Sequence, residues 1–269
     1  MKKCVRCDTE LKPGKSLCHV CKAFNAVTDE HSSVTCDEDD TSTSLAETES
    51  AEHKRLNVGE WNPIFGKEEG KKGGIVTTSV NILAGTPGAG KSTGVISLIR
   101  SALKAHPKRV VMYLSGEELK SEVRSRADRL GCTKDELERF RIIELIKDPG
   151  NIPGIFNKWK PVIGIVDSIQ GICGKDDSVA EQLCTDAKRS IAAPLECPMI
   201  LISHVNKGAE VAGAMTLQHA VDGTFLLMPI DDQLRQLEAL KNRNGPTRSI
   251  YFTMTEAGLV RARAPEEDE

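Results

Sequence analysis

One stretch of eight residues constrains the fold of this chain more than any other feature. It fits the pattern G-x-x-x-x-G-K-[ST] at every position, and an apolar run (80–84) precedes it while a helix-forming stretch (91–105) follows. Such a loop between a strand and a helix turns backbone N–H groups and a helix N-terminus toward phosphate oxygens. A glycine-rich turn that binds nothing is the alternative, which the full match in this context disfavours. The phosphate-binding residues predicted here are Gly85, Thr86, Pro87, Gly88, Ala89, Gly90, Lys91, Ser92 and Thr93.

The chemistry of this loop predicts ATP and Mg²⁺ as cofactors. Lys91 is expected to reach the β- and γ-phosphates and to take part in catalysis, while the Ser92 hydroxyl coordinates Mg²⁺. Asp167 ends the apolar strand VIGIV, which is the usual place for the carboxylate that contacts the metal through water. A helix or turn cap is the alternative reading of Asp167.

The remaining apolar runs predict an α/β fold of the P-loop class with a mainly parallel central sheet and helices on both faces. Runs at 80–84, 110–115, 162–166 and 199–203 are nearly continuous in apolar character, as in strands covered on both sides. Helical stretches at 91–105, 117–131 and 178–193 alternate with them. Two further strands, roughly 234–241 and 248–254, are expected to flank a hairpin turn at Asn244-Gly245.

Two groups of residues are candidates for completing an ATP hydrolysis site. Glu117 and Glu118 follow the second strand, where a carboxylate could orient the attacking water, and we favour Glu117. Acidic residues also commonly open a helix, which is the competing explanation. His204 ends another strand and could sense the γ-phosphate, although a lone histidine there is as often only a satisfied polar residue.

The predicted hairpin carries Lys241 and Arg243 beside its turn. They are either charged flanks of an ordinary surface turn or cations presented to the ATP of a neighbouring subunit, where an arginine finger contributes to the rate. The residues alone leave both readings open.

The first 26 residues predict a small zinc ribbon. Cys4-x-x-Cys7 and Cys18-x-x-Cys21 have the spacing of a tetrahedral Cys₄ site, whose Zn²⁺ would be structural because protein ligands fill all four positions. Two disulfides or a redox pair are the disfavoured alternatives, and the five other cysteines are expected to be reduced thiols.

Composition divides the rest of the chain. Residues 27–55 are predicted to be an acidic, disordered linker, since 28–52 contain nine acidic residues and no Lys or Arg. The formal charge of −3 therefore leaves −3 + 9 = +6 elsewhere, which is compatible with binding an anionic polymer. The ATPase domain is expected at 56–262 and an acidic tail at 263–269. No apolar run is long enough for a membrane helix and no signal peptide is seen, so a cytoplasmic protein with no membrane partner is expected.

Several separate stretches resemble the bacterial RadA (Sms) family of DNA repair ATPases. They are the Cys₄ unit, the P-loop, Ser115-Gly-Glu-Glu118, Arg126–Gly131, Asp167-Ser-Ile-Gln170, His204-Val-Asn-Lys207, Gly213–Asp222 and Lys241-Asn-Arg-Asn-Gly245. The resemblance implies a RecA-like core with Glu117 as catalytic base, His204 as γ-phosphate sensor, and Lys241 and Arg243 acting in trans. It further implies a ring, expected to be a homo-hexamer, with Lys207 in a loop that contacts single-stranded or branched DNA, and a recombinase partner.

The resemblance has two departures. The family continues into a Lon-protease-like domain, which we expect this chain to lack, and its K-N-R-F-G motif reads K-N-R-N-G here. The sequence predicts a DNA-dependent ATPase that moves along single-stranded DNA to promote strand exchange or branch migration. A DnaB-type replicative helicase and an ATP-switched assembly protein without motor activity are the alternatives.

Overall fold

The computed structural model describes residues 9–10, 46, 53–66, 73–146, 149–174, 176–205 and 217–265. The chain divides into two units, Met1–Ala51 and Glu52–Glu269, and the second contains the elements described here. The predicted zinc ligands Cys4, Cys7, Cys18 and Cys21 lie outside the described residues, as do Lys207 and nearly all of the predicted linker.

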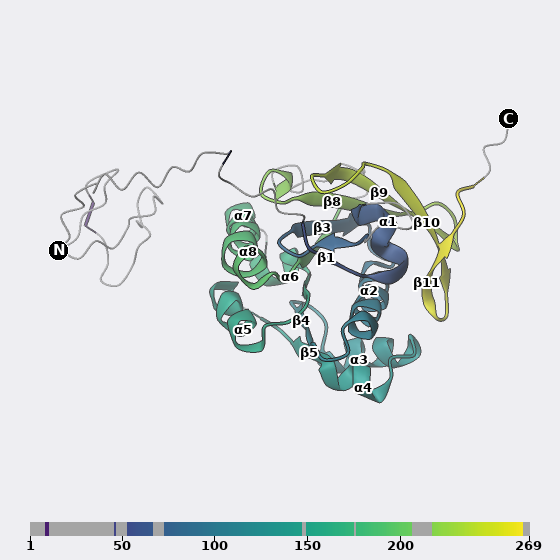
Figure 1. Cartoon of the computed structure of the whole chain (residues 1–269), viewed down its shortest axis with the longest axis horizontal. Coiled ribbons are helices and arrows are strands. Elements are labelled where there is room, and N and C mark those ends of the chain that lie inside the picture. Colours follow the sequence, from purple (N-terminus) through teal and green to yellow (C-terminus); the bar gives the residue numbers. More distant parts are fainter. Residues whose placement is uncertain are drawn as a thin grey trace. The chain divides into compact units, whose positions relative to one another are not determined.

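The elements follow one another in the order that Figure 1 labels. Their bounds are β1 (Arg55–Leu56), η1 (Gly59–Trp61), α1 (Asn62–Phe65), β2 (Ile75–Val76), β3 (Val80–Gly85), α2 (Lys91–Ala105), β4 (Val111–Ser115), α3 (Lys120–Arg129), α4 (Lys134–Arg139), β5 (Phe140–Ile143), η2 (Pro149–Asn151), α5 (Ile152–Trp159), β6 (Gly164–Asp167), α6 (Ile169–Cys173), α7 (Asp177–Asp186), η3 (Ala187–Ala192), α8 (Ala193–Leu195), β7 (Met199–His204), β8 (Gly223–Pro229), β9 (Leu234–Asn242), β10 (Ser249–Thr255) and β11 (Gly258–Ala262).

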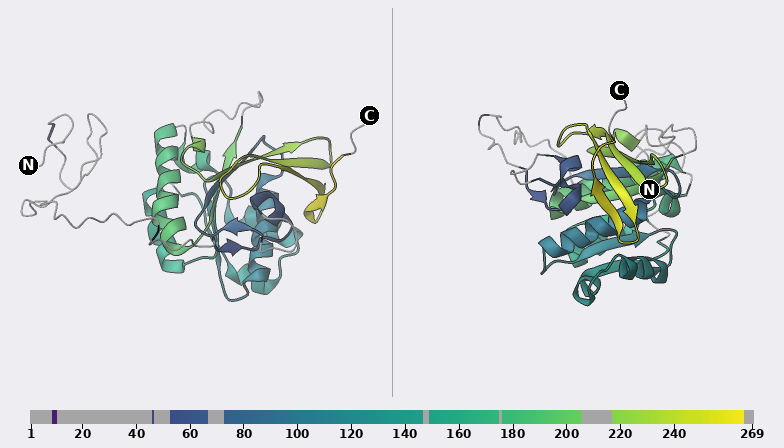
Figure 2. Two further views of the ribbon diagram at one scale, coloured as in Figure 1. Left: turned by 45° about the horizontal axis from the view of Figure 1, so that its top comes forward. Right: turned by 90° about the vertical axis from the view of Figure 1, so that its right-hand side faces the viewer.

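A nine-stranded sheet forms the centre, in the order β11-β10-β9-β8-β3-β7-β6-β4-β5. From β8 to β5 all neighbouring strands are parallel, whereas β9, β10 and β11 are antiparallel to their neighbours. Figure 2 shows these last strands, coloured yellow-green to yellow, curving away from the parallel part. The predicted parallel α/β core is therefore confirmed, with an antiparallel extension at one edge.

Helices cover both faces of the parallel strands, which explains their continuous apolar character. All six residues of β3 are buried, and Leu83 packs in one core cluster with α2 while its neighbour Ile82 packs in the other with α7. Both faces must be apolar for this arrangement, because successive side chains of a strand point to opposite sides.

The helix after the loop begins and ends for local reasons. Gly90 precedes its first residue with a positive φ of 98°, and Val95 to Leu103 supply its buried face. Its C-cap, His106, leaves the helical conformation because Pro107 follows, and the residue before a proline is disfavoured in that conformation.

Three strands of the central sheet were not predicted from the sequence: β5, β8 and β11. The long helix expected at 178–193 is instead α7, a π-helical stretch (η3) and the short α8. The helix expected at 117–131 begins only at Lys120, so Glu117 and Glu118 precede it and are not its first turn.

The predicted hairpin around Asn244-Gly245 is confirmed, since β9 and β10 pair as antiparallel strands on either side of it. β9 ends at Asn242 and β10 begins at Ser249, so the connection is wider than two residues. The Asn242 side chain holds the loop by donating to the carbonyls of Ile64 and Pro246 and by accepting from the N–H of Asn244. Pro246 lacks the N–H that a continued ladder would need.

In the part of the chain that the structure describes, no helix has the length and apolar character required to cross a bilayer.

Candidate nucleotide site

The loop between β3 and α2 adopts a conformation that requires glycine at two positions. Gly88 and Gly90 have φ angles of 79° and 98°, which residues other than glycine rarely adopt. A Cβ atom at Gly90 would also come within 2.4 Å of the Met254 Cε atom. The predicted strand–loop–helix context is thus present, with residues 86–90 as the loop.

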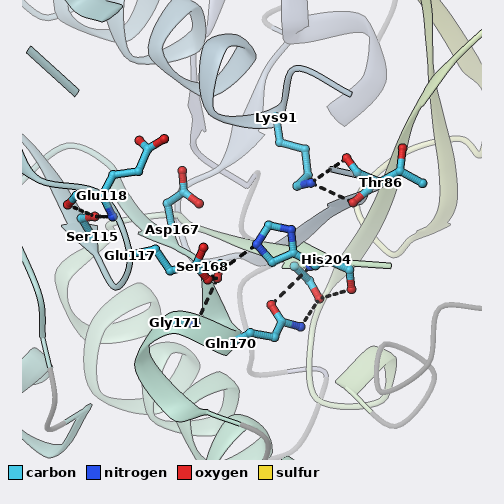
Figure 3. A network of polar contacts seen from close by, with 12 residues as sticks. Thr86, Lys91, Ser115, Glu117, Glu118, Asp167, Ser168, Gln170, Gly171 and His204 are labelled. Atoms are coloured by element: carbon cyan, nitrogen blue, oxygen red, sulfur yellow. Dashed lines mark hydrogen bonds and ion pairs between the residues drawn. The ribbon is translucent and has the colours of Figure 1, made fainter. Parts of the chain in front are cut away.

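Lys91 is the first residue of α2, and its side chain turns back toward the loop (Figure 3). Its ammonium group donates hydrogen bonds to the carbonyl oxygens of Gly85, at 2.7 Å, and of Thr86, at 3.0 Å. Burial lowers its pKa, and the charges of Asp167 and Glu117 oppose that shift. A buried cation is therefore held within the loop by nearby carboxylates and backbone dipoles.

Asp167 ends β6 beside the start of α2. Its carboxylate accepts a hydrogen bond of 2.5 Å from the Tyr113 hydroxyl and another from the hydroxyl of Ser92. Burial raises its pKa, while both hydrogen bonds act in the opposite direction. Tyr113 lies two residues before the end of β4, so a residue of the strand next to β6 orients this carboxylate.

The donor set at this point fits Mg²⁺. Magnesium prefers oxygen ligands and usually binds through one or two carboxylates together with phosphates of the substrate. Ser92 and Asp167 supply one hydroxyl and one carboxylate next to Lys91. No cluster of three or more His, Cys, Asp or Glu side chains suited to a metal occurs among the described residues. A site completed by substrate phosphates needs no such cluster.

Glu117 lies in the segment between β4 and α3, with its side chain half exposed. Ser168 donates a hydrogen bond of 2.6 Å to its Oε1 atom, and the Nε2 atom of His204 lies 3.7 Å from the same oxygen. Gly171 makes room for this carboxylate, since a Cβ there would lie 2.6 Å from the Glu117 Cγ atom. Glu117, Ser168 and His204 therefore form one group beside Lys91 (Figure 3).

Glu118 has a different partner. Arg126 of α3 binds its two carboxylate oxygens through two hydrogen bonds of 2.6 and 2.7 Å. The same pairing raises the pKa of Arg126. A carboxylate held in a bidentate ion pair is less available as a proton acceptor. The geometry gives a reason to prefer Glu117 over Glu118 that the sequence did not contain.

A pocket of about 370 Å³ joins these elements. Its lining residues are Pro87, Gly88, Gly90, Lys91, Ser92, Thr93, Glu118, Arg126, His204 and Met254. Sequence reasoning had given no role to Arg126, Met254 or Tyr113, because each reaches the site from another element. Glu117, Glu118 and Asp167 were the only local signals in the sequence that residues of other elements complete this site.

His204 ends β7 and is joined to α6 by Gln170. The Gln170 amide accepts a hydrogen bond of 3.2 Å from the N–H of His204 and donates one of 3.0 Å to the hydroxyl of Ser203. Hydrogen bonds therefore join α6, which follows β6, to the end of β7 (Figure 3).

Lys241 and Arg243 lie away from this pocket. Lys241 donates to the carbonyl oxygens of Val221, at 2.8 Å, and of Gln218. Arg243 is exposed, and hydrogen bonds through Asp222 place it level with Val80 at the start of β3. Gly85 is five residues further along this strand, which corresponds to about 16 Å at about 3.3 Å per residue. Both cations thus belong to the opposite end of the sheet.

Comparisons with known proteins agree with this geometry. The family model described as "ATPase: KaiC" matches residues 63–260. The DNA repair protein RadA of Haemophilus influenzae is 30% identical over 97% of this chain and 59% of its own length. The RadA protein of Bacillus subtilis is 30% identical over 98% of this chain and 60% of its own length. The RadA protein of Mycolicibacterium smegmatis is 34% identical over 77% of this chain and 44% of its own length. The chain thus spans about 60% of the length of the first two relatives.

Proposed function

The chain belongs to the KaiC family of ATPases, and we propose that it is a DNA repair ATPase whose turnover depends on single-stranded DNA. The proposal extends to the finer activity: movement along the DNA that promotes strand exchange or branch migration. The observation that carries it is the grouping of Asp167 and Glu117 around Lys91, which itself lines a pocket of about 370 Å³, on a chain that resembles RadA proteins.

Each side chain of the group has a distinct task in the proposed reaction. Lys91 and the backbone N–H groups of the loop hold the phosphates, and Glu117 accepts the proton of the attacking water. Ser168 orients the Glu117 carboxylate through the hydrogen bond described above. Mg²⁺, held by Ser92 and Asp167, would neutralise the charge that develops on the β- and γ-phosphate oxygens. His204 lies within reach of both Glu117 and the pocket, as a γ-phosphate sensor requires.

We further propose that Lys241 and Arg243 act on the nucleotide of a neighbouring subunit in a ring, with six subunits as the expected number. Their separation from Lys91 of the same chain supports this arrangement, because neither cation faces its own phosphate loop. A closed ring repeats one head-to-tail interface, so each subunit would both receive and donate these cations. Lys207 is proposed as a phosphate contact to DNA, and a recombinase as the partner.

The experiment that tests this proposal is steady-state ATP turnover by the full chain, with and without single-stranded DNA. Lys91→Ala should abolish turnover while the chain stays folded. Arg243→Ala should reduce turnover but spare ATP binding. An equal mixture of the two variants is the sharpest arm, because a Lys91→Ala subunit retains Arg243 and an Arg243→Ala subunit retains Lys91.

In random assembly of that mixture, about one interface in four combines an intact phosphate loop with an intact Arg243, so about a quarter of wild-type turnover should return. Arg243→Ala chains that remain fully active would refute the action in trans. Turnover that DNA does not stimulate would favour the ATP-switched assembly protein. Unwinding of a plain fork without a recombinase would favour the replicative helicase.

A further inference from the structure

Five exposed cations gather around an exposed tryptophan at the end of the sheet opposite the nucleotide pocket. Lys108 and Arg109 precede β4, Arg141 lies in β5, and Lys158 and Lys160 flank Trp159 at the end of α5. We call Lys108, Arg109, Arg141, Lys158, Trp159 and Lys160 the basic patch. Phosphate-loop residues follow the carboxyl end of β3, whereas the patch lies where β4, β5 and β6 begin.

Short-range contacts hold the patch together. The Arg141 guanidinium lies over the Trp159 ring, with its Cζ atom 4.8 Å from the ring centroid. Arg109 donates a hydrogen bond of 3.1 Å to the carbonyl oxygen of Lys160. Arg139 donates one of 3.3 Å to the carbonyl of Arg109 and is itself paired with Asp135. Three segments distant in sequence are therefore fixed as one surface (β5 and α5 are labelled in Figure 1).

The positive charge of the patch is uncompensated in the described part of the chain. None of its five cations forms an ion pair there, whereas Arg139, Lys120 and Arg124 do. Trp159 keeps 40% of its surface exposed at the centre of this charge. Scattered solvated lysines would explain the charge alone, but they would not explain a tryptophan presented among them.

We propose that the basic patch binds single-stranded nucleic acid, as a second contact surface separate from the nucleotide pocket. Proteins bind such strands by pairing cations with the phosphates and by stacking bases on aromatic side chains. The patch offers both within one surface. The acidic stretch 28–52 of this chain has the complementary charge, but it contains no Phe, Tyr or Trp that could stack on the tryptophan.

The inference shares only the DNA ligand with the proposed function, because binding at the patch needs no ATP hydrolysis. The experiment titrates the full chain into a fluorescein-labelled thymidine oligonucleotide and follows fluorescence anisotropy over a series of salt concentrations. Trp159→Ala removes the stacking surface, and Trp159→Phe should restore it. The double variant Lys108→Gln/Lys158→Gln removes charge alone. Arg263→Gln, an exposed cation beyond the strand β11 at the far edge of the sheet, is the matched control.

Trp159→Ala should weaken binding by roughly fivefold or more with the salt dependence unchanged, because stacking is not an ionic contact. The double variant should weaken binding and reduce the slope of log K against log salt by about 1.4, since each phosphate contact to a single strand contributes about 0.7. Arg263→Gln should match the wild type. ATP turnover without DNA should be unaffected in all of these variants.

Patch variants that bind the oligonucleotide like the wild type would overturn the inference. A synthetic peptide of residues 28–52 supplies the other arm. The patch belongs to the acidic segment if two results are found together. First, the wild type and Trp159→Ala bind this peptide but the double variant does not. Second, the patch variants bind the oligonucleotide as the wild type does. Patch-dependent oligonucleotide binding in a chain whose ATP turnover ignores DNA would refute the proposed function and leave the inference standing.

Discussion

The Tyr113 hydroxyl provides a precise test of how the candidate metal carboxylate is held. Tyr113→Phe removes one oxygen and keeps the ring, which packs 5.9 Å from Phe140 between their centroids, so no cavity is created. What changes is the hydrogen bond to Asp167. Asp167 is only 9% exposed, and water cannot readily replace the lost donor.

The expected magnitude follows from that burial. Leaving a buried acceptor without one of its partners costs about 1–3 kcal/mol of the free energy of unfolding. The hydrogen bond also orients the carboxylate toward Ser92, and removing such an outer contact typically weakens metal affinity by about 10- to 100-fold. The concentration of Mg²⁺ for half-maximal ATP turnover should therefore rise by at least about tenfold.

The stability effect should depend on pH in a defined direction. Burial raises the pKa of Asp167, and the Tyr113 hydroxyl opposes this shift because it stabilises the ionised carboxylate. The Tyr113→Phe substitution would thus let the pKa of Asp167 rise further. The difference in unfolding free energy between the two proteins should be present above the pKa of Asp167 in the folded state and shrink as the pH falls through it.

The assays are urea unfolding at two pH values and Mg²⁺ titration of both ATP turnover and the binding of a fluorescent ADP analogue. Tyr251→Phe is the matched control, since the chain has only two tyrosines and Tyr251 lies in β10, in the antiparallel part of the sheet. Its substitution should change stability by less than about 0.5 kcal/mol. If Tyr113→Phe and Tyr251→Phe behave alike in both assays, the hydroxyl does not hold Asp167.

Three other predictions concern packing, thiols and metal. Gly164→Ala should destabilise the chain by about 1–3 kcal/mol in urea unfolding, because its Cβ would lie 2.3 Å from Phe156 and 2.4 Å from Met199, while Gly154→Ala, with open space around it, should not. Burial raises the pKa of the Cys184 and Cys197 thiols to about 12, so at pH 8 both should resist alkylation until the chain is unfolded, as peptide mass spectrometry would reveal. The purified chain should contain zinc in equimolar amount by elemental analysis, and Cys4→Ser/Cys7→Ser should lose it without lowering the melting temperature of the ATPase domain; a zinc-free wild type contradicts the ribbon.

The sequence predicted the phosphate loop and the parallel core well because both are local patterns. A loop between a buried strand and a helix is defined by consecutive residues. Gly88 and Gly90 have positive φ angles, and the presence of glycine at these two positions is the signal for that conformation in the sequence. The position of Asp167 at a strand end was predictable for the same reason, although its role as metal ligand and those of Glu117 and His204 stay predictions.

What the sequence did not reveal depends on contacts between distant elements. The choice between Glu117 and Glu118 rests on Arg126, whose side chain reaches Glu118 from the next helix. Tyr113 meets Asp167 only because β4 and β6 are paired with Ser115 opposite Asp167. The hairpin itself was predictable, but its connection is longer than two residues, and no local preference of Asn244-Gly245 records the contacts that Arg55 and Asn242 make with this loop.

The hairpin of β9 and β10 touches the phosphate loop at one end and carries Arg243 at the other. Met254, near its open end, lies over Gly90, whereas Arg243 follows the last residue of β9. About nine residues of strand separate these ends, or about 30 Å at about 3.3 Å per residue. In a ring built as proposed, this hairpin would link the nucleotide of one protomer to that of the next. Events at successive ATP molecules would then be mechanically connected.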